Sequence, residues 1–438
     1  MTVIEYVRQR FSPEAQNSTI TREIVAGATT FFTIAYIFII NPSLLGSTGL
    51  DQQTVLTATI LISALATIGM GLLANVPLIL APGMEMNSYF VFILVGYRNI
   101  DPQSALGIVF WCGVLFIIAN ITNLRTKLIQ EFPTVLKSSF SIAMGAFLVV
   151  VGLKIGGVLI YNEHLICSGI GVLEGPAFWI FVLSVSAVYL FDGVLKIRGG
   201  ILLSVIITFI VSHLAGWLDV SNSPSPSGSI VSSIKFMPKL NVLSNGSAIS
   251  ALLTLFVIDF FGSIAKVVSM TKGTKLEITD GDTRALKRAL YVDGIATTGG
   301  ALMGTSNVTI YVESHVGIRQ GARTGLSSVV CGILMLAVLP FSKWLSLIPV
   351  NVAAGVLVYI GFLIINSTKT PLMTAGVQEK ISMFLMAAMV VGTLSLDKAI
   401  LIGLISSVIQ SVRNKNPISP VLLISTIVLA GAVWTSWV

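Results

Sequence analysis

Three carboxylates lie inside long apolar stretches of this sequence, where an ionised side chain is costly. Asp259 lies in LTLFVIDFFGSIAK, Glu313 in TIYVESHVG and Glu85 in APGMEMNSYF. Acids in such surroundings usually face a cavity or a partner and mark the path of a solute or an ion. A buried carboxyl without a partner can take up and release a proton. In the alternative interpretation, Lys266 or a backbone donor neutralises each carboxylate and the role of the acid is structural.

The elements that carry these acids must be helices in lipid rather than helices in water. The 438 residues are 54% hydrophobic and only 10% charged, with a mean hydropathy of +0.92. A soluble domain carries about 25% charged residues because its surface faces water. Apolar stretches long enough to cross a bilayer recur from end to end. The composition therefore predicts an all-α polytopic membrane protein without a separate soluble domain.

The apolar stretches divide into about fourteen predicted spans, seven in each half of the chain. The Ser/Pro-rich segment SNSPSPSGS, which begins at Ser221, is the clearest break between the halves. We therefore expect a cytoplasmic N-terminal segment at 1–22, a seven-span repeat at 23–218, an external loop at 219–247 and a second seven-span repeat at 248–438. The spans are expected near 24–45, 54–73, 77–97, 104–123, 138–158, 175–193, 197–218, 248–270, 289–303, 304–318, 323–342, 350–366, 380–412 (long enough to be two shorter pieces) and 418–437.

Lysine and arginine predict the orientation of the chain. With the N-terminus inside, the loops that face the cytoplasm hold many more basic residues than the outer loops do. The positive-inside rule then places both termini in the cytoplasm, with the chain in the cytoplasmic (inner) membrane. These loops also account for the formal net charge of +7. We therefore expect membrane lipid, and no nucleic acid, as a partner.

The sequence has no pattern that predicts a metal site, a cofactor or an enzyme. Its three cysteines and three histidines are scattered, without CxxC or other metal-ligand spacing. The motifs HExxH and GxSxG, which mark metalloproteases and serine hydrolases, do not occur. A channel is not indicated either, because there is no repeated filter motif and no ring of pore charges. We expect a protein that is not an enzyme and that has no resident cofactor.

Two of the expected spans are not uninterrupted helices. The third span contains Pro82–Gly83, and the tenth opens with GTSN, which includes Thr305, Ser306 and Asn307. Non-helical backbone at membrane depth is tolerated only where protein or a water-filled cavity satisfies it. The freed backbone groups of matching breaks can hold an anionic or hydrogen-bonding solute. The alternative is that both breaks are packing kinks.

The two broken spans resemble each other, which indicates an internal repeat. With an offset of 221 residues, Gly83 lies over Gly304 and Arg98 lies over Arg319. Repeats of seven spans, an odd number, must be upside down with respect to one another. Inverted repeats are typical of secondary transporters, which bind their substrate near the bilayer midplane where the repeats meet.

Four ordered segments of the chain resemble the nucleobase–cation symporter-2 family. They are REIVAGATTFFTIAYIFIINP, NVPLILAPGMEMNSYF, YVDGIATTGGALMGTSNVTIYVES and GIRQGARTGL, and the resemblance runs from about Arg22 to the last span. Within the family, the match is to the branch that carries hypoxanthine, guanine and adenine. The resemblance implies import of a purine nucleobase by proton symport with an elevator-type movement. Na⁺ stays open as the alternative coupling ion.

The resemblance also implies the fold. Two inverted repeats of seven spans would form a core domain from spans one to four and eight to eleven. The gate domain would come from spans five to seven and twelve to fourteen, and a homodimer would form through it. The third and tenth spans would each hold a short extended piece followed by a half-helix.

The family's binding residues carry over to the positions that match its motifs. Asn87 matches the Asn of the third-span motif, Asp259 the first acid of the eighth span and Glu313 the Glu of the tenth. The resemblance implies that Asp259 and Glu313 also take part in proton coupling. A purine edge presents donors and acceptors that a carboxylate and free backbone groups can match. The substrate site is further expected to include Glu85, Thr305, Ser306, Asn307 and Phe260, whose ring can stack on a base.

Four positions depart from the pattern that is usual in the family. Gly262 stands where the family commonly has a second acid, three residues after the first. Glu85 stands where a small residue is usual, Lys266 where a small or hydroxyl residue is usual, and Asn307 where a Thr is usual. We expect Glu85 either to substitute for the missing acid or to pair with Lys266. In both cases the solute need not be an ordinary purine.

Two alternatives with the same fold stay open, namely a carrier of another small solute or an anion, and a divergent member that does not transport. Sulfate and bicarbonate carriers share the architecture, but they usually replace the acids of the eighth and tenth spans and append a soluble C-terminal domain. This chain keeps Asp259 and Glu313 and ends at Val438, directly after its last span. The purine carrier is therefore the leading hypothesis.

Overall fold

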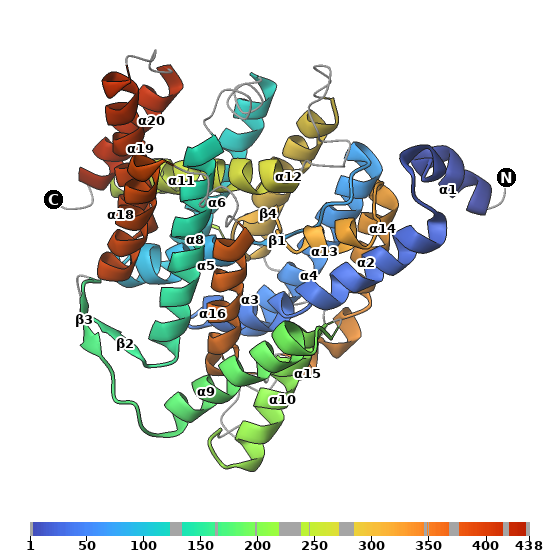
Figure 1. Cartoon of the computed structure of the whole chain (residues 1–438), viewed down its shortest axis with the longest axis horizontal. Coiled ribbons are helices and arrows are strands. Elements are labelled where there is room, and N and C mark those ends of the chain that lie inside the picture. The colour runs from blue at the N-terminus through green and yellow to red at the C-terminus, as the bar shows by residue number, and fades with distance from the viewer. Residues whose placement is uncertain are drawn as a thin grey trace.

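The computed structural model is almost entirely helical (Figure 1). It describes residues 3–122, 134–162, 165–197, 199–218, 238–244, 246–270, 284–345, 348, 350–367, 376–414 and 420–434. Most of the external loop expected at 219–247 lies outside these residues.

The helices of the first half follow the expected spans. Asp51 and Asp101 begin two of them, because their carboxylates accept hydrogen bonds from the backbone N–H groups of Thr54 and Ser104 at 2.8 and 2.9 Å. The elements are α1 (Val3–Phe11), η1 (Glu14–Gln16), α2 (Ile20–Ile34), α3 (Ile37–Gly46), α4 (Gln52–Gly69), η2 (Met70–Ala74), β1 (Leu80–Pro82), α5 (Met84–Ser88), η3 (Tyr89–Tyr97), α6 (Pro102–Ile121), α8 (Thr134–Ile155), a hairpin of β2 (Leu159–Tyr161) and β3 (Cys167–Ile170), α9 (Pro176–Val188), η4 (Tyr189–Val194) and α10 (Gly200–Leu214).

The described part of the second half is also mostly helical and has one short strand. The elements are η5 (Leu240–Ser244), α11 (Gly246–Met270), α12 (Arg284–Met303), β4 (Val308–Ile310), α13 (Ser314–Arg319), α14 (Gly325–Leu336), η6 (Leu339–Phe341), α15 (Ser342–Leu345), α16 (Val350–Ser367), α18 (Val377–Thr393), α19 (Leu396–Arg413) and α20 (Pro420–Trp434). The stretch 380–412 is two helices that pack against each other, because Leu394 takes a left-handed conformation between them. The last two expected spans are therefore three helices.

The tenth expected span, 304–318, is not one helix. It is the strand β4 followed by the short helix α13, and the third span is likewise β1 followed by α5 and the π-helical η3. The 221-residue offset aligns Arg98, which directly follows η3, with Arg319, which ends α13. It does not align the strands β1 and β4. β4 begins 228 residues after β1, because the helix that follows β1 runs to Tyr97 and is longer than α13.

Helices from opposite halves of the chain pack in close pairs. In Figure 1, α8 and α16 lie side by side near the centre, and α4 packs on α14 as α6 packs on α12. Glycines allow these close approaches: a Cβ on Gly145 of α8 would lie 2.7 Å from the carbonyl oxygen of Gly361 in α16. Small residues at helix contacts are the usual means of bringing membrane helices together.

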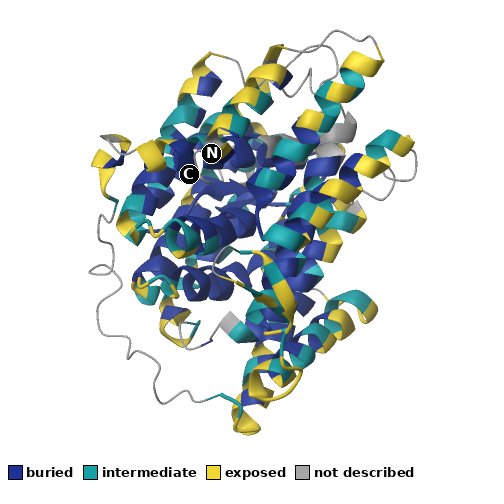
Figure 2. Ribbon diagram, turned by 90° about the vertical axis from the view of Figure 1, so that its left-hand side faces the viewer, coloured by how far each residue is buried: buried dark blue, intermediate teal, exposed yellow. Residues whose placement is uncertain are grey.

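Several of the described helices are long and apolar enough to cross a membrane by length and composition. Buried residues gather in the middle of the molecule, and exposed residues lie on the outer faces and ends of the helices (Figure 2). The five longer helical segments are Ile20–Gly46, Gln52–Ala74, Pro102–Ile121, Pro176–Val194 and Gly325–Leu345, and shorter apolar helices lie at Ser139–Ile155, Gly200–Leu214, Gly246–Phe260, Asn351–Asn366 and Leu422–Gly431.

Candidate functional site

Two strands from opposite halves of the chain meet inside the protein. β1 pairs antiparallel with β4, with Leu80 opposite Ile310, Ala81 opposite Thr309 and Pro82 opposite Val308. Every residue of both strands is buried. Such short strands satisfy few of their own backbone groups, so the neighbouring side chains must supply the remaining hydrogen bonds.

Hydroxyl groups complete the hydrogen bonding of this crossing. The Thr67 hydroxyl of α4 bonds both backbone groups of Leu80, accepting from its N–H at 3.0 Å and donating to its carbonyl oxygen at 3.1 Å. Thr297 of α12 donates in the same way to the carbonyl oxygen of Val308 at 2.7 Å. The Tyr311 hydroxyl donates to the carbonyl oxygen of Pro82. The breaks in the third and tenth spans are therefore a built, hydrogen-bonded structure rather than two separate kinks.

Asn87 lies in a buried polar network at the start of the first half-helix. Its Nδ2 donates to Oδ1 of Asn41, and its Oδ1 accepts from the hydroxyl of Ser306. Asn41 donates in turn to the hydroxyls of Thr59 and Thr305, at 2.6 and 2.9 Å. The structure thus brings together three of the expected residues, Asn87, Thr305 and Ser306. Both polar atoms of the Asn87 side chain are used within the protein, which suits a residue that positions the crossing.

Asp259 of α11 meets Asn307 just before β4. Nδ2 of Asn307 donates to Oδ2 of Asp259 at 3.0 Å, and the hydroxyl of Ser263 lies 3.3 Å from Oδ1. Within the described ranges, Oδ1 of Asn307 and the hydroxyl of Thr309 are buried without a hydrogen-bond partner. A buried polar atom without a partner is costly. These two atoms can therefore receive hydrogen bonds from a bound solute.

Glu313 lies between β4 and α13 and is partly buried. The hydroxyl of Tyr36, at the bend between α2 and α3, donates to Oε1 of Glu313 at 2.6 Å. Glu85 and Lys266 are close enough for their charges to act on this carboxylate. Glu313 therefore belongs to the same centre as the crossing strands, with a neutral hydroxyl as its hydrogen-bond partner.

Glu85 pairs with Lys266, which is one of the two outcomes expected for it. The ammonium group of Lys266 in α11 contacts Oε1 of Glu85 in α5, and both residues are at most 7% exposed. A buried ion pair loses much hydration and needs good geometry to compensate. Gly262 does not face this pair: a Cβ at Gly262 would lie 3.1 Å from Cε of Met144 in α8.

Phe260 lies beside Asp259 in the chain and ends a row of three aromatic rings. The ring centroids of Phe116 and Phe256 are 5.0 Å apart, and those of Phe256 and Phe260 are 5.5 Å apart. Phe116 comes from α6 and the other two from α11. Phe260 thus packs in the protein core and also lies within one residue of the expected binding carboxylate.

Several residues of this centre were not among the expected site residues, including Ser263, Thr309 and Tyr311. Tyr36, Asn41 and Thr59 come from the first two spans, and each hydrogen-bonds an expected residue, Tyr36 to Glu313 and the other two to Thr305. Asn41 carries a recognisable signal, because it is an amide inside the apolar run IFIINPS. Tyr36 and Thr59 carry none, since both residue types are common in apolar helices.

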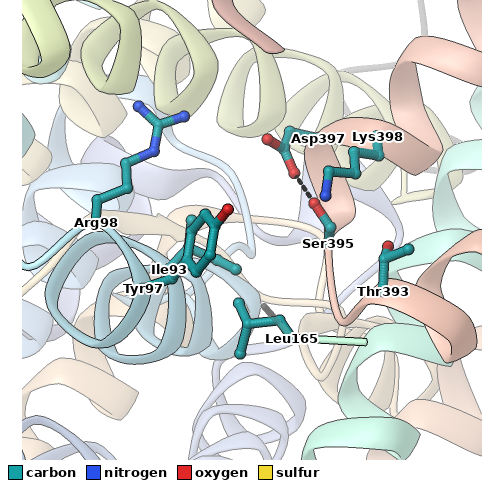
Figure 3. A pocket seen from close by; sticks show the side chains of 8 residues that line it. All are labelled: Ile93, Tyr97, Arg98, Leu165, Thr393, Ser395, Asp397 and Lys398. Carbon is teal, nitrogen blue, oxygen red and sulfur yellow. Dashed lines mark hydrogen bonds between the residues drawn. The ribbon is translucent and has the colours of Figure 1, made fainter. Parts of the chain in front are cut away.

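A polar pocket lies away from the crossing, between η3 and the link from α18 to α19 (Figure 3). Tyr97 and Arg98 line it on one side, and Ser395, Asp397 and Lys398 line it on the other. The Ser395 hydroxyl donates to the buried carboxylate of Asp397, and Arg98 donates to the hydroxyl of Ser250 at 2.9 Å. The expected site residues do not line this pocket.

Comparison with protein-family models places residues 21–402 in a group described as the permease family. Among curated proteins, the chain is 30% identical over 402 residues to adenine permease AdeP of Escherichia coli, covering 92% of this chain and 89% of the relative. It is also 30% identical over 435 residues to guanine/hypoxanthine permease PbuO of Bacillus subtilis, covering 95% of this chain and 98% of that one.

Solved structures share the fold at lower sequence identity. The transmembrane domain of the cyanobacterial bicarbonate transporter BicA superposes with a TM-score of 0.64 at 18% identity, covering 89% of this chain and 97% of that one. The murine anion transporter of Solute Carrier 26 family member A9, in its inward-facing state, superposes with a TM-score of 0.63 at 9% identity, covering 90% of this chain and 68% of that one.

Proposed function

The chain belongs to the permease family of nucleobase–cation symporters, and from this premise we propose that it carries a purine nucleobase across the membrane. Membership makes it a multi-pass membrane protein and a transporter rather than an enzyme. Its sequence relatives are named for adenine and for guanine/hypoxanthine, whereas anion carriers share only the fold. A fold alone does not define a substrate. The substrate class therefore follows the sequence relatives and not the fold relatives.

The observation that carries this proposal is that two hydrogen-bond acceptors, Oδ1 of Asn307 and the carboxylate of Asp259, lie together at the crossing. Oδ1 of Asn307 lacks a partner among the described residues, and it belongs to the same side chain that holds Asp259. A purine has ring and amino N–H groups along one edge, which can donate to an amide oxygen and to a carboxylate together. A solute without these donors would leave buried acceptors unpaired, which selects against it strongly. Stacking of the base on the ring of Phe260, which follows Asp259 in α11, is part of the same proposal.

The proton is proposed to enter on Asp259 or Glu313. Both carboxylates hydrogen-bond to neutral groups, the amide of Asn307 and the hydroxyl of Tyr36. Acids at such positions within membrane spans are typical of proton relays in transporters. Glu85 differs, because its partner is the ammonium group of Lys266. In this proposal Asn87, Thr305 and Ser306 position the crossing around the substrate.

Alternating access is proposed as an elevator movement of a core past a gate. The core comprises spans one to four and eight to eleven, and the gate comprises spans five to seven and twelve to fourteen. The contacts between the two halves support inverted repeats. If α4 corresponds to α12 and α6 to α14, the contact of α4 with α14 has its counterpart in the contact of α12 with α6. The hydroxyls of Thr67 and Thr297 also bond equivalent strands. The gate would supply the contact of a homodimer.

We propose the orientation of the chain in the membrane by counting its crossings from the N-terminus. With the N-terminus in the cytoplasm and the chain in the inner membrane, α18 and α19 are the thirteenth and fourteenth crossings. The chain then returns to the cytoplasmic side at Arg413, and α20 follows as an additional helix. Basic residues near this end agree with a cytoplasmic location.

Uptake by cells that lack their own purine carriers tests the proposal. Labelled adenine, guanine, hypoxanthine, xanthine and uracil are supplied with and without a protonophore, and expression is checked in the membrane fraction. We expect saturable uptake of one or more purines, lost with the protonophore and with Glu313→Gln. Well-expressed, folded protein that takes up none of these bases would contradict the proposed substrate class.

A further inference from the structure

Lys266 is a charged side chain in a place where basic residues are rare. It is 7% exposed, and it is the one Lys or Arg that is buried among the residues that the structure describes. It contacts Glu85, which is 5% exposed and lies two residues before Asn87. A lone buried charge would cost several kcal/mol, and the contact between the two side chains offsets this cost.

The pair lies within the proposed site rather than beside it. Asp259, Ser263 and Lys266 are spaced four and three residues apart on α11, so they form one face of the helix. Side chains of a helix lean toward its N-terminus, which directs the long Lys266 side chain back toward the level of Asp259. The titratable groups around it are Glu85, Glu313, Tyr36 and Tyr311, which interact with each other electrostatically, and Asp259 on its own helix.

We infer that the Lys266 ammonium is a tethered counter-cation for Glu85, so that Glu85 needs no cation from solution during transport. A carboxylate in a site that crosses the membrane must be neutralised by a proton, a metal cation or a basic side chain. An ammonium attached to α11 does this permanently, but it cannot dissociate and so it takes no energy from an ion gradient. Coupling is then left to Asp259 and Glu313. This inference rests on the proposed purine transport.

A purely structural role makes a different prediction. If the pair only fastened α5 to α11, replacing Lys266 would lower stability and transport rate, but each purine would still travel with the same number of protons. If Lys266 replaces a cation, its removal leaves Glu85 to be neutralised from solution, and the number of protons per purine rises by one.

The test measures the proton-to-purine ratio in vesicles that contain the purified full chain. The membrane potential is clamped with potassium and valinomycin, and the pH difference that just prevents net movement along a known purine gradient is determined. We expect the ratio of Lys266→Met to exceed that of wild type by one. Lys266→Gln, which keeps a hydrogen-bond donor for Glu85, should give the same increase if the Met variant does not fold.

Lys239→Met is the matched control, because Lys239 also pairs with a carboxylate, that of Asp101, but on an exposed surface. Its ratio should equal that of wild type. Equal ratios in wild type, Lys266→Met and Lys266→Gln would overturn the inference. Purine-for-purine exchange, which needs no net cation movement, is measured first in the same vesicles. Absence of exchange in wild type would overturn the proposed function itself. Exchange together with equal proton-to-purine ratios in wild type and the Lys266 variants would overturn only the inference that Lys266 replaces a cation.

Discussion

The amide group of Asn307 donates a hydrogen bond of 3.0 Å to the carboxylate of Asp259, and this bond ties the start of β4 to the middle of α11. The other end of the same amide is a buried acceptor without a partner among the described residues. One side chain therefore both orients the carboxylate and presents an acceptor of its own. This arrangement makes the pair the centre of the proposed binding site.

Asp259→Asn should strongly reduce purine uptake while the protein still folds. The substitution keeps the size of the side chain but removes the charge that receives a purine N–H, and hydrogen bonds to charged groups contribute about 1.5–3 kcal/mol. We expect kcat/KM to fall at least about tenfold. Asp101→Asn, a change of the same type in an exposed residue outside the spans, should leave uptake unchanged. Equal uptake by both variants would contradict a role for Asp259.

Asn307→Ala should raise KM more than it lowers kcat. It removes the acceptor offered to the solute and the donor that orients Asp259, so binding of the ground state is weakened. We expect KM for the transported purine to rise by about two- to tenfold, as for the loss of one neutral hydrogen bond of about 0.5–1.5 kcal/mol. Initial uptake rates over a range of purine concentrations measure this. A variant with unchanged KM would show that Asn307 does not contact the solute.

Gly325→Ala should destabilise the protein, because the added Cβ would lie 2.1 Å from the backbone oxygen of Gly71. Overpacking of this kind typically costs about 1–3 kcal/mol. Gly392→Ala in α18 is the control, since a Cβ there would meet nothing within 4 Å. Thermal unfolding of the two purified variants should show a lower midpoint for Gly325→Ala only. Similar midpoints would contradict the close contact of α14 with η2.

The stability that Asp101 contributes should depend on pH. Partial burial would raise the pKa of Asp101, but hydrogen bonds from Ser104 and the nearby ammonium of Lys239 outweigh it and hold the pKa below its usual value. A lowered pKa gives stability that is present above the usual carboxyl value and is lost as pH falls through the lowered one. Asn keeps the helix cap but removes the charge that pairs with Lys239, so Asp101→Asn should be less stable than wild type near pH 7 by at most about 1 kcal/mol, as for an exposed ion pair. The difference should vanish in acid, and a constant difference would contradict this assignment.

The breaks in the third and tenth spans could be predicted from sequence because Pro and Gly are local signals. Pro82–Gly83 and GTSN interrupt apolar runs, and the strands β1 and β4 lie at these places. The pairing register could not be predicted in this way. The 221-residue offset matches the region after the half-helices, where Arg98 and Arg319 lie, and not the strands, since the two half-helices differ in length.

The partners of the acids depend on contacts between distant spans, which no local pattern reveals. Pairing of Glu85 with Lys266 was one of two expected outcomes, and the contact between α5 and α11 decides between them. The bond from Tyr36 to Glu313 joins residues 277 positions apart. The division of 380–412 at Leu394 also needed tertiary structure, because a left-handed Leu has no sequence signature.

Direct binding of labelled purine to the purified chain tests the central claim most directly. Adenine, guanine and hypoxanthine are titrated against wild type, Asp259→Asn and Asp101→Asn in detergent, with folding checked by thermal unfolding. The account predicts saturable binding of a purine to a single site in wild type and Asp101→Asn, and its loss in Asp259→Asn. Folded wild-type protein that binds no purine, or binding that Asp259→Asn leaves unchanged, would contradict it.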